Sequence, residues 1–172
     1  ALQSKARGAG SLNWVPEYDQ IIRRLPLLVR VGNELYPSLA AEALRVGQGA
    51  TQYIVKASGA SGEEAFGRKT GLNTVRIGQL VVPTDASGQI WLRFTKSDRR
   101  RFISAAQLLD GKVARTETEG RVILIGTSAP GLFDLRTTPL DTAVAGVEVH
   151  AQAVEQMLLE QHLERPDFAT GA

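Results

Sequence analysis

A candidate catalytic serine, Ser128, lies at the centre of residues 126–130 (GTSAP). The four residues that precede this segment, Val122 to Ile125, are all apolar, which is typical of a short strand buried on both faces. Open α/β sheets place ligands and active sites in loops that follow such strands. The spacing nearly matches the nucleophile elbow G-x-S-x-G, and Asp134 or Asp141 and then His150 follow in the order used by α/β-hydrolases.

Two features argue against hydrolysis by Ser128. The elbow needs a small residue that lets a helix start and pack closely on the strand, whereas Pro130 and Gly131 follow here and break a helix. Only 22 residues (150 − 128) separate Ser128 from His150, although α/β-hydrolases carry the acid and the base after later strands. A serine hydrolase that uses Ser128 therefore stays an alternative, to be tested by mutating Ser128 to alanine.

Polar residues are concentrated in the loop that follows the predicted strand: Thr127, Ser128, Asp134, Arg136, Thr137, Thr138 and Asp141. Asp134 and Arg136 are two residues apart and could pair with each other, which would fix the loop. Alternatively, Arg136 could present its guanidinium group to an anionic ligand. We favour internal pairing, and we place the candidate ligand-binding residues in this loop and the following helix: Thr127, Ser128, Asp134, Arg136, Thr137 and His150.

His150 shares one face of a predicted helix with apolar residues, namely Val147, Val154 and Met157. This position favours a core histidine that is hydrogen-bonded to backbone, with pH sensing or ligand contact as the alternatives. The other histidine, His162, is twelve residues away, which is about 18 Å along a helix and too far to share an ion. Glu148 is two residues from His150 and points to a different helix face. We therefore predict no metal site.

Residues 62–70 (GEEAFGRKT) partly resemble a phosphate-binding loop. An additional residue, Arg68, shifts Lys69 and Thr70 out of register, and no buried strand leads directly into Gly62. We treat this match as coincidental and expect no cofactor.

The composition is that of a globular chain: 172 residues, 43% hydrophobic and 22% charged, with no apolar run long enough to span a bilayer. The formal charge is +2, and the longest basic run, Arg99–Arg101, has no interleaved aromatic residues. This small excess of charge argues against nucleic-acid binding. The absence of cysteine excludes disulfides and thiolate chemistry.

Strands and helices alternate along the chain, which predicts one α/β domain with a mixed sheet flanked by helices. We expect strands on either side of Pro26 and at 51–55, 74–82, 89–94 and 122–125, with 74–94 as a hairpin or strand pair. Helices are predicted at 38–48, 104–109 and 147–163. Residues 56–73, which are rich in glycine, serine and charge, are predicted to form a loop.

Residues 121–140 (RVILIGTSAPGLFDLRTTPL), followed by 146–153 (GVEVHAQA), resemble the C-terminal signature of the type-two CHASE domain, the cyclase/histidine-kinase-associated sensory extracellular domain. Residues 19–27 are similar to its N-terminal segment, 36–40 to its first helix, and 83–88 with Trp91 to its central turn and strand. The resemblance extends from about Leu12 to Pro166. It departs from the family at Gln20, where a glycine is common, and in the variable region 56–73.

The resemblance implies a non-catalytic sensory domain outside the cytoplasmic membrane of a bacterium, with membrane helices before and after it. The implied cytoplasmic output is an adenylate or diguanylate cyclase, a histidine kinase or a serine/threonine kinase. The implied partner is a small-molecule or protein signal, and the domain could form a homodimer. The family provides no established catalytic residues and no generally known ligand.

These implications divide the chain into a flexible leader (1–11), the extracytoplasmic sensory domain (12–166) and a tail toward a membrane span (167–172). We expect the chain to be a piece of a longer protein, since it starts at Ala1 and its only methionine is Met157. The alternative to a sensor is a structural or dimerisation module without a ligand.

Overall fold

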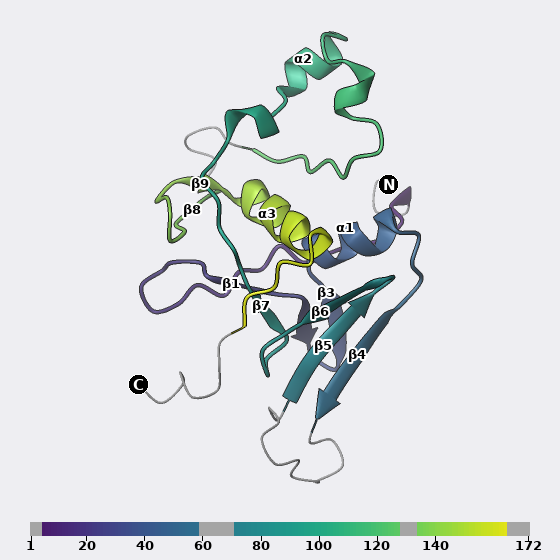
Figure 1. The fold of residues 1–172 in the computed structure, drawn as a ribbon, viewed down its shortest axis with the longest axis vertical. Helices are drawn as coiled ribbons and strands as arrows, with labels where there is room; N and C mark the ends of the chain where they lie inside the picture. Colours follow the sequence, from purple (N-terminus) through teal and green to yellow (C-terminus); the bar gives the residue numbers. More distant parts are fainter. Residues whose placement is uncertain (1–4, 59–70, 128–133, 165–172) are drawn as a thin grey trace.

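The structure, a computed structural model, describes residues 5–58, 71–127 and 134–164 (Figure 1). The strands are β1 (Arg24–Pro26), β2 (Leu28–Val31), β3 (Glu34–Pro37), β4 (Tyr53–Ser58), β5 (Gly71–Ile77), β6 (Leu80–Pro83), β7 (Gln89–Trp91), β8 (Leu135–Arg136) and β9 (Val144–Ala145). The α-helices are α1 (Leu39–Gly47), α2 (Ala105–Leu109) and α3 (Gly146–Leu158), and the short 3-10 turns are η2 (Arg99–Arg101) and η3 (Arg115–Glu117).

The strands of the described residues form small antiparallel sheets, in which β1 pairs with β7, β2 with β3, β4 with β5 and then β6, and β8 with β9. Residues of these sheets, such as Leu25, Val75 and Ile90, share one hydrophobic core with α1 and α3. The predicted single-domain α/β class is confirmed. No helix of the described residues is long and apolar enough to cross a membrane.

Helix α1 forms where local signals predict it. Ser38 caps its start, because the Ser38 hydroxyl accepts a hydrogen bond from the Ala41 backbone N–H at 3.3 Å. Its end lies at Gly47, and Gly49 takes a left-handed conformation with φ of 66° directly after it. The predicted helix at 38–48 is confirmed.

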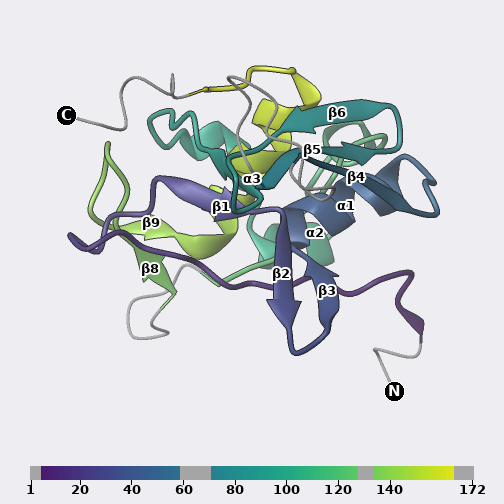
Figure 2. The ribbon, with the colours of Figure 1, turned by 90° about the horizontal axis from the view of Figure 1, so that it is seen from below.

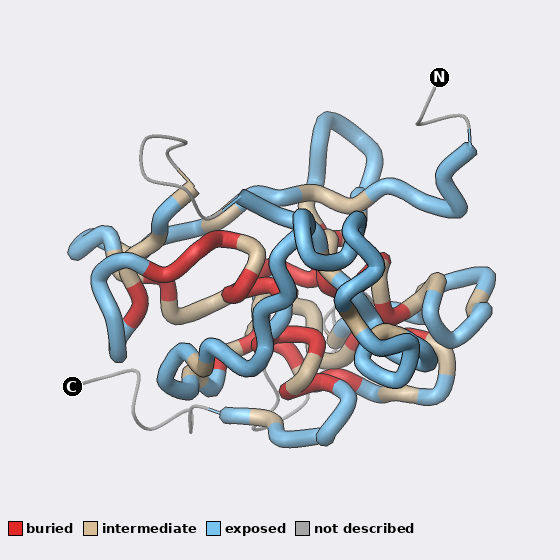
Figure 3. Tube along the Cα trace, turned by 90° about the horizontal axis from the view of Figure 1, so that it is seen from above, coloured by how far each residue is buried: buried red, intermediate tan, exposed pale blue. Residues whose placement is uncertain are grey.

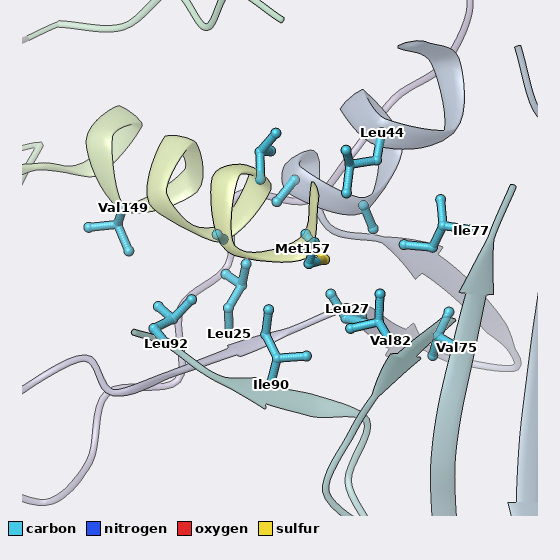
Figure 4. Close-up of a cluster of buried hydrophobic side chains, with 14 of the residues drawn as sticks. Leu25, Leu27, Leu44, Val75, Ile77, Val82, Ile90, Leu92, Val149 and Met157 are labelled. Carbon is cyan, nitrogen blue, oxygen red and sulfur yellow. The ribbon is translucent and has the colours of Figure 1, made fainter. Parts of the chain in front are cut away.

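The core lies between the α1–α3 helix pair and the strands (Figure 4). The helices contribute Leu44, Val149 and Met157, and the facing strands contribute Leu25, Ile90, Val75, Ile77 and Val82. Helices α1 and α3 contact each other, and their alanines Ala40, Ala41 and Ala153 are fully buried in the same core. This packing fixes the position of α3, which carries the candidate site.

The predicted strand at 74–82 is wrong, because a turn divides it. β5 and β6 form a hairpin around Gly78, whose φ of 59° favours glycine. The hairpin or strand pair expected within 74–94 is also wrong, because the strand at 89–91, β7, pairs with β1 and not with the strand before it. Part of the predicted loop 56–73 is strand, because β4 continues to Ser58 and β5 begins at Gly71. The segment that resembles a phosphate-binding loop lies outside the described residues.

Residues 96–127, here called the arm, leave the core after β7 and return beside α3; they form the upper part of Figure 1. The predicted helix at 104–109 is confirmed as α2, which has no buried residue. The predicted buried strand at 122–125 is wrong: Ile123 is 52% and Ile125 is 92% exposed, and no strand of the described chain pairs with them. Figure 3 shows the arm as almost entirely exposed.

The predicted helix at 147–163 ends earlier, because α3 stops at Leu158 and Glu160 takes a left-handed conformation with φ of 53°. The chain then turns back, and Leu163 forms an isolated antiparallel bridge with Trp91. The segment that follows α3 is therefore held against the end of β7.

The N-terminal segment runs across the molecule below the helices (Figure 2) and is hydrogen-bonded to the start of α1. The Ser11 N–H donates to the Pro37 carbonyl at 2.7 Å, and the Leu39 N–H donates to the Ser11 carbonyl at 2.8 Å. Further along α1, Arg45 Nη2 donates to the Arg7 carbonyl at 3.1 Å. These bonds place residues 7–11 on α1.

We expect Gly10→Ala to weaken this attachment. An alanine Cβ at Gly10 would lie 2.6 Å from the Leu39 Cα and 2.7 Å from the Leu39 nitrogen, and backbone cannot rotate away as a side chain can. The expected loss in free energy of unfolding is roughly 1–2 kcal/mol, measured by urea denaturation. The matched control is Gly47→Ala, whose new Cβ would lie 3.8 Å from Val122 Cγ2, an ordinary contact. Equal effects of the two substitutions would contradict the prediction.

Candidate functional site

The candidate site lies at the start of α3, where β9 runs directly into the helix. β8 pairs with β9, with Leu135 opposite Ala145 and Arg136 opposite Val144. The Gly146 N–H donates to the Asp134 carbonyl at 2.8 Å. The hairpin between β8 and β9 therefore brings Asp134 and Arg136 beside the first turn of α3.

Asp134 and Arg136 pair with each other, as predicted from their spacing. Arg136 Nη2 lies 3.5 Å from Asp134 Oδ1, and Arg136 Nη1 donates to the Leu135 carbonyl at 3.1 Å. The Asp134 carboxylate lies over Gly146, where any Cβ would overlap it. The glycine thus permits a carboxylate close to the positive end of the helix dipole.

The threonines of the predicted loop shape the β8–β9 hairpin. The Thr138 hydroxyl donates to the Asp141 carbonyl and accepts from the Asp141 N–H, both at 3.1 Å. The Thr137 hydroxyl donates to the Thr142 carbonyl at 3.3 Å. Asp141 Oδ1 accepts from the Ala143 N–H at 3.1 Å. These bonds fix the connection between β8 and β9.

An open groove of about 270 Å³ lies between this hairpin, the beginning of the arm and α3. It is lined by Thr95, Lys96, Ser97, Thr138, Leu140, Asp141, Val144 and Gln152. Two of the residues in the predicted polar loop, Thr138 and Asp141, therefore border a cavity. Lys96, Ser97 and Gln152 are residues of this groove that the sequence did not reveal.

A buried polar network forms the side of the groove next to α3. The Ser97 hydroxyl donates to Glu148 Oε2 at 3.0 Å, and Gln152 Nε2 donates to Glu148 Oε1 at 3.3 Å. Glu148 and Gln152 are both buried and lie one helical turn apart. The spacing of Glu148 and Gln152 could have indicated that they share a helix face. The contact between Thr95 and Gln152 could not have been predicted, because the two residues are 57 positions apart and no local pattern reveals such a contact.

Two glutamines of α3 bind the extended chain that continues from β7; we call this arrangement the glutamine ladder. Gln156 donates to the Trp91 carbonyl at 2.8 Å and accepts from the Arg93 N–H at 2.7 Å. Gln152 accepts from the Thr95 N–H at 3.0 Å and donates to the Thr95 carbonyl at 3.2 Å. Four helical residues rise about 6 Å and two strand residues span about 6.6 Å, so the spacings match.

His150 is buried at 1% exposure, which confirms its predicted place in the core. Its ring lies against Trp14, with ring centroids 4.3 Å apart and an angle of 39° between the planes. The hydrogen bond expected between His150 and backbone is absent, since neither ring nitrogen has a partner among the described residues. Burial lowers the pKa of His150 to about 4, and the nearby Asp134 carboxylate partly opposes this shift.

The remaining predicted residues do not enter the groove. Thr127 is exposed at the end of the arm, beside Gly126, where a Cβ would overlap the Val147 side chain. Ser128 lies outside the described residues, so the structure does not test whether it forms a nucleophile elbow. No group of His, Cys, Asp and Glu side chains suited to a metal ion occurs in the described part of the chain.

Comparison with known proteins tests the family resemblance. Residues 2–171 match the CHASE2 domain, which is nearly the whole chain. No curated protein and no solved structure matches the chain. The resemblance seen in residues 121–153 is therefore confirmed over the full domain. The chain belongs to the CHASE2 domain family, whose members are non-catalytic sensor domains that typically lie outside the cytoplasm.

Proposed function

We propose that this domain is the extracytoplasmic signal-input part of a bacterial membrane protein whose cytoplasmic output is a nucleotide cyclase or a kinase. The observation that carries the proposal is the CHASE2 match over residues 2–171. A sensor that transmits across a membrane needs a site for the signal and a mechanical link from that site to an end of the domain. The described residues offer candidates for both.

The proposed ligand site is the groove beside α3. Lys96 and Asp141 line it with opposite charges, and neither forms an ion pair within the described part of the chain. Thr95, Ser97 and Thr138 add hydroxyl groups to the same lining. This combination suits a small polar molecule that carries both a positive and a negative group.

Three of the ligand-binding residues predicted from the sequence lie next to this groove, in or beside the β8–β9 hairpin. Asp134, Arg136 and Thr137 brace the hairpin that forms one wall. Thr127 lies at the end of the arm, where Gly126 meets α3, and does not line the groove. His150 lies in the core against Trp14 and does not line the groove.

The proposed link to the output is the glutamine ladder. Gln152 lines the groove and also binds the backbone of Thr95. One turn further, Gln156 binds the backbone of Trp91, which in turn pairs with Leu163 after α3. A ligand that changes the position of the groove walls would thus shift the segment that follows α3.

A thermal-shift screen with small zwitterionic and other polar compounds tests the groove. A ligand that binds only the native state is expected to raise the melting temperature, and Lys96→Ala with Asp141→Asn is expected to abolish that rise. The matched control is Lys112→Ala with Asp110→Asn, which removes one ion pair of the arm outside the groove. A rise that persists in the groove variant would contradict this site.

The full-length gene tests the membrane context. Apolar spans on both sides of the domain and a cyclase or kinase domain beyond them are expected. A gene that encodes neither would contradict the proposed function.

A second candidate function is self-association through the arm. Leu109 is 86% and Ile125 is 92% exposed, although both are large apolar side chains. Sedimentation of the wild type and of a Leu109→Asp, Ile125→Asp variant distinguishes this function. A dimer that dissociates in the variant, together with no response to any compound, would favour a dimerisation module without ligand.

A further inference from the structure

His150 is placed where a histidine is costly to the folded state. It is buried, and neither ring nitrogen has a hydrogen-bond partner among the described residues. A neutral imidazole carries one N–H donor and one acceptor, so both stay unpaired. An apolar side chain of similar size would avoid this cost, which makes His150 a poor choice for stability alone.

Trp14 contacts the imidazole from the N-terminal segment and is itself only partly buried. This segment is fixed at one end by the bonds of Ser11 to Pro37 and Leu39. At the other end, the Ile22 N–H donates to the Thr137 carbonyl at 2.9 Å. Between these points, residues 12–16 form no backbone–backbone hydrogen bond within the described chain. The part that covers His150 is thus held mainly by side-chain contact.

The charged groups around His150 are few. Asp134, from the segment before β8, attracts a protonated imidazole, but it is shared with Arg136 at 3.5 Å. On α3 itself, Glu148 is hydrogen-bonded to Ser97 and Gln152. On the N-terminal segment, Glu17 pairs with Arg23 at 3.0 Å. Asp134 alone among the described residues therefore favours the cation at this place, against the cost of burial.

We propose that Trp14 and His150 form an acid-sensitive latch, in which protonation of His150 displaces Trp14 and releases residues 12–16 from α3. An imidazolium ion needs water or hydrogen-bond acceptors, and the burial of His150 provides neither. Displacement of Trp14 exposes the ring to water without breaking a backbone–backbone hydrogen bond of residues 12–16. The domain thereby responds to acidity on the side of the membrane where it resides.

The extent to which acid releases Trp14 follows from the difference between the pKa of His150 when Trp14 covers it and the pKa when it is exposed to water. The pKa of His150 is about 4 when covered, compared with 6.5 for a free histidine. The ratio of released to latched molecules is therefore expected to rise roughly 300-fold from neutral to strongly acidic pH. This response does not depend on the groove, so it can exist whether or not the groove binds a ligand.

Tryptophan fluorescence of the 172-residue chain tests the latch. Trp91→Phe leaves Trp14 as the single tryptophan. Its emission is expected to move to longer wavelength on acidification, with a midpoint between pH 6.5 and 4, while far-ultraviolet circular dichroism stays unchanged. His150→Phe and His150→Gln, made in the same background, are expected to remove the transition. His162→Gln is the matched control and is expected to retain it.

Two outcomes would overturn the latch. One is a transition that persists in both His150 variants, which would assign it to another group. The other is a loss of helical signal that coincides with the fluorescence change, which would indicate unfolding of the whole domain. As a second measurement, Trp14→Ala is expected to raise the pKa of His150 by more than one unit, seen by proton NMR of the imidazole; an unchanged pKa would also overturn the proposal.

Discussion

Replacement of both Gln152 and Gln156 by alanine is expected to lower the free energy of unfolding by roughly 2–5 kcal/mol. The double substitution removes every side-chain partner of the glutamine ladder from the carbonyls of Trp91 and Thr95 and the N–H groups of Arg93 and Thr95. Each unpaired backbone group in a water-excluded place costs about 1–3 kcal/mol, and partial access of water reduces the sum. Chemical denaturation measures the loss.

The control for this prediction is Gln107→Ala on the exposed helix α2. It makes the same chemical change away from the core and is expected to alter stability by less than about 0.5 kcal/mol. The two single substitutions share one stretch of backbone, so their effects are not expected to add. A double variant as stable as Gln107→Ala would show that the glutamine ladder contributes nothing.

Acidification from pH 7 to pH 4.5 is expected to lower the free energy of unfolding by about 1–2 kcal/mol through His150. The pKa of His150 is about 4 in the folded state, below the ordinary value of 6.5. Between these values the unfolded chain binds the proton and the folded chain with Trp14 in place does not, so acid favours unfolding; release of Trp14 lets the folded chain bind the proton too and reduces the loss. The full stability is present above pH 6.5 and falls as the pH decreases toward 4.

Carboxyl groups with a lowered pKa, such as Asp98 and Glu42, lose their contribution mainly at lower pH, which separates them from His150. The hydrogen bond from Arg100 holds the pKa of Asp98 at about 2, and the hydrogen bond from Arg45 lowers the pKa of Glu42. Their stabilising effects are present above the ordinary carboxyl pKa and decrease only below it. Denaturation at pH 7 and 4.5 should therefore show a much smaller decrease in His150→Phe. An equal decrease in wild type and variant would refute the assignment to His150.

The parts of the fold that follow from short-range signals were predictable. Pro37, Ser38 and Gly49 mark both ends of α1, because capping and left-handed backbone depend on a few neighbouring residues. The strand predicted at 122–125 was wrong because strand formation depends on residues distant in the sequence. Four apolar residues satisfy the pattern of a buried strand, but a strand also needs a partner, and the arm provides none in the described chain.

The candidate site shows the same division. The pairing of Asp134 with Arg136 was predictable because the two residues are close in the sequence. The contributions of Lys96 and Ser97 were not, because they reach the groove from the beginning of the arm. For His150, the helical pattern predicted burial correctly, but it contains no information on which polar atoms surround the ring.

The two ends of the arm have a consequence for how this domain can vary among its relatives. The arm begins where Ser97 binds Glu148 and ends where Gly126 meets Val147, and these two helix residues are neighbours. Both ends of the arm thus contact the same turn of α3. The residues between them can change in number without altering the distance between the two ends. We therefore expect the middle of the arm, residues 98–120, to tolerate insertions and deletions better than the core does.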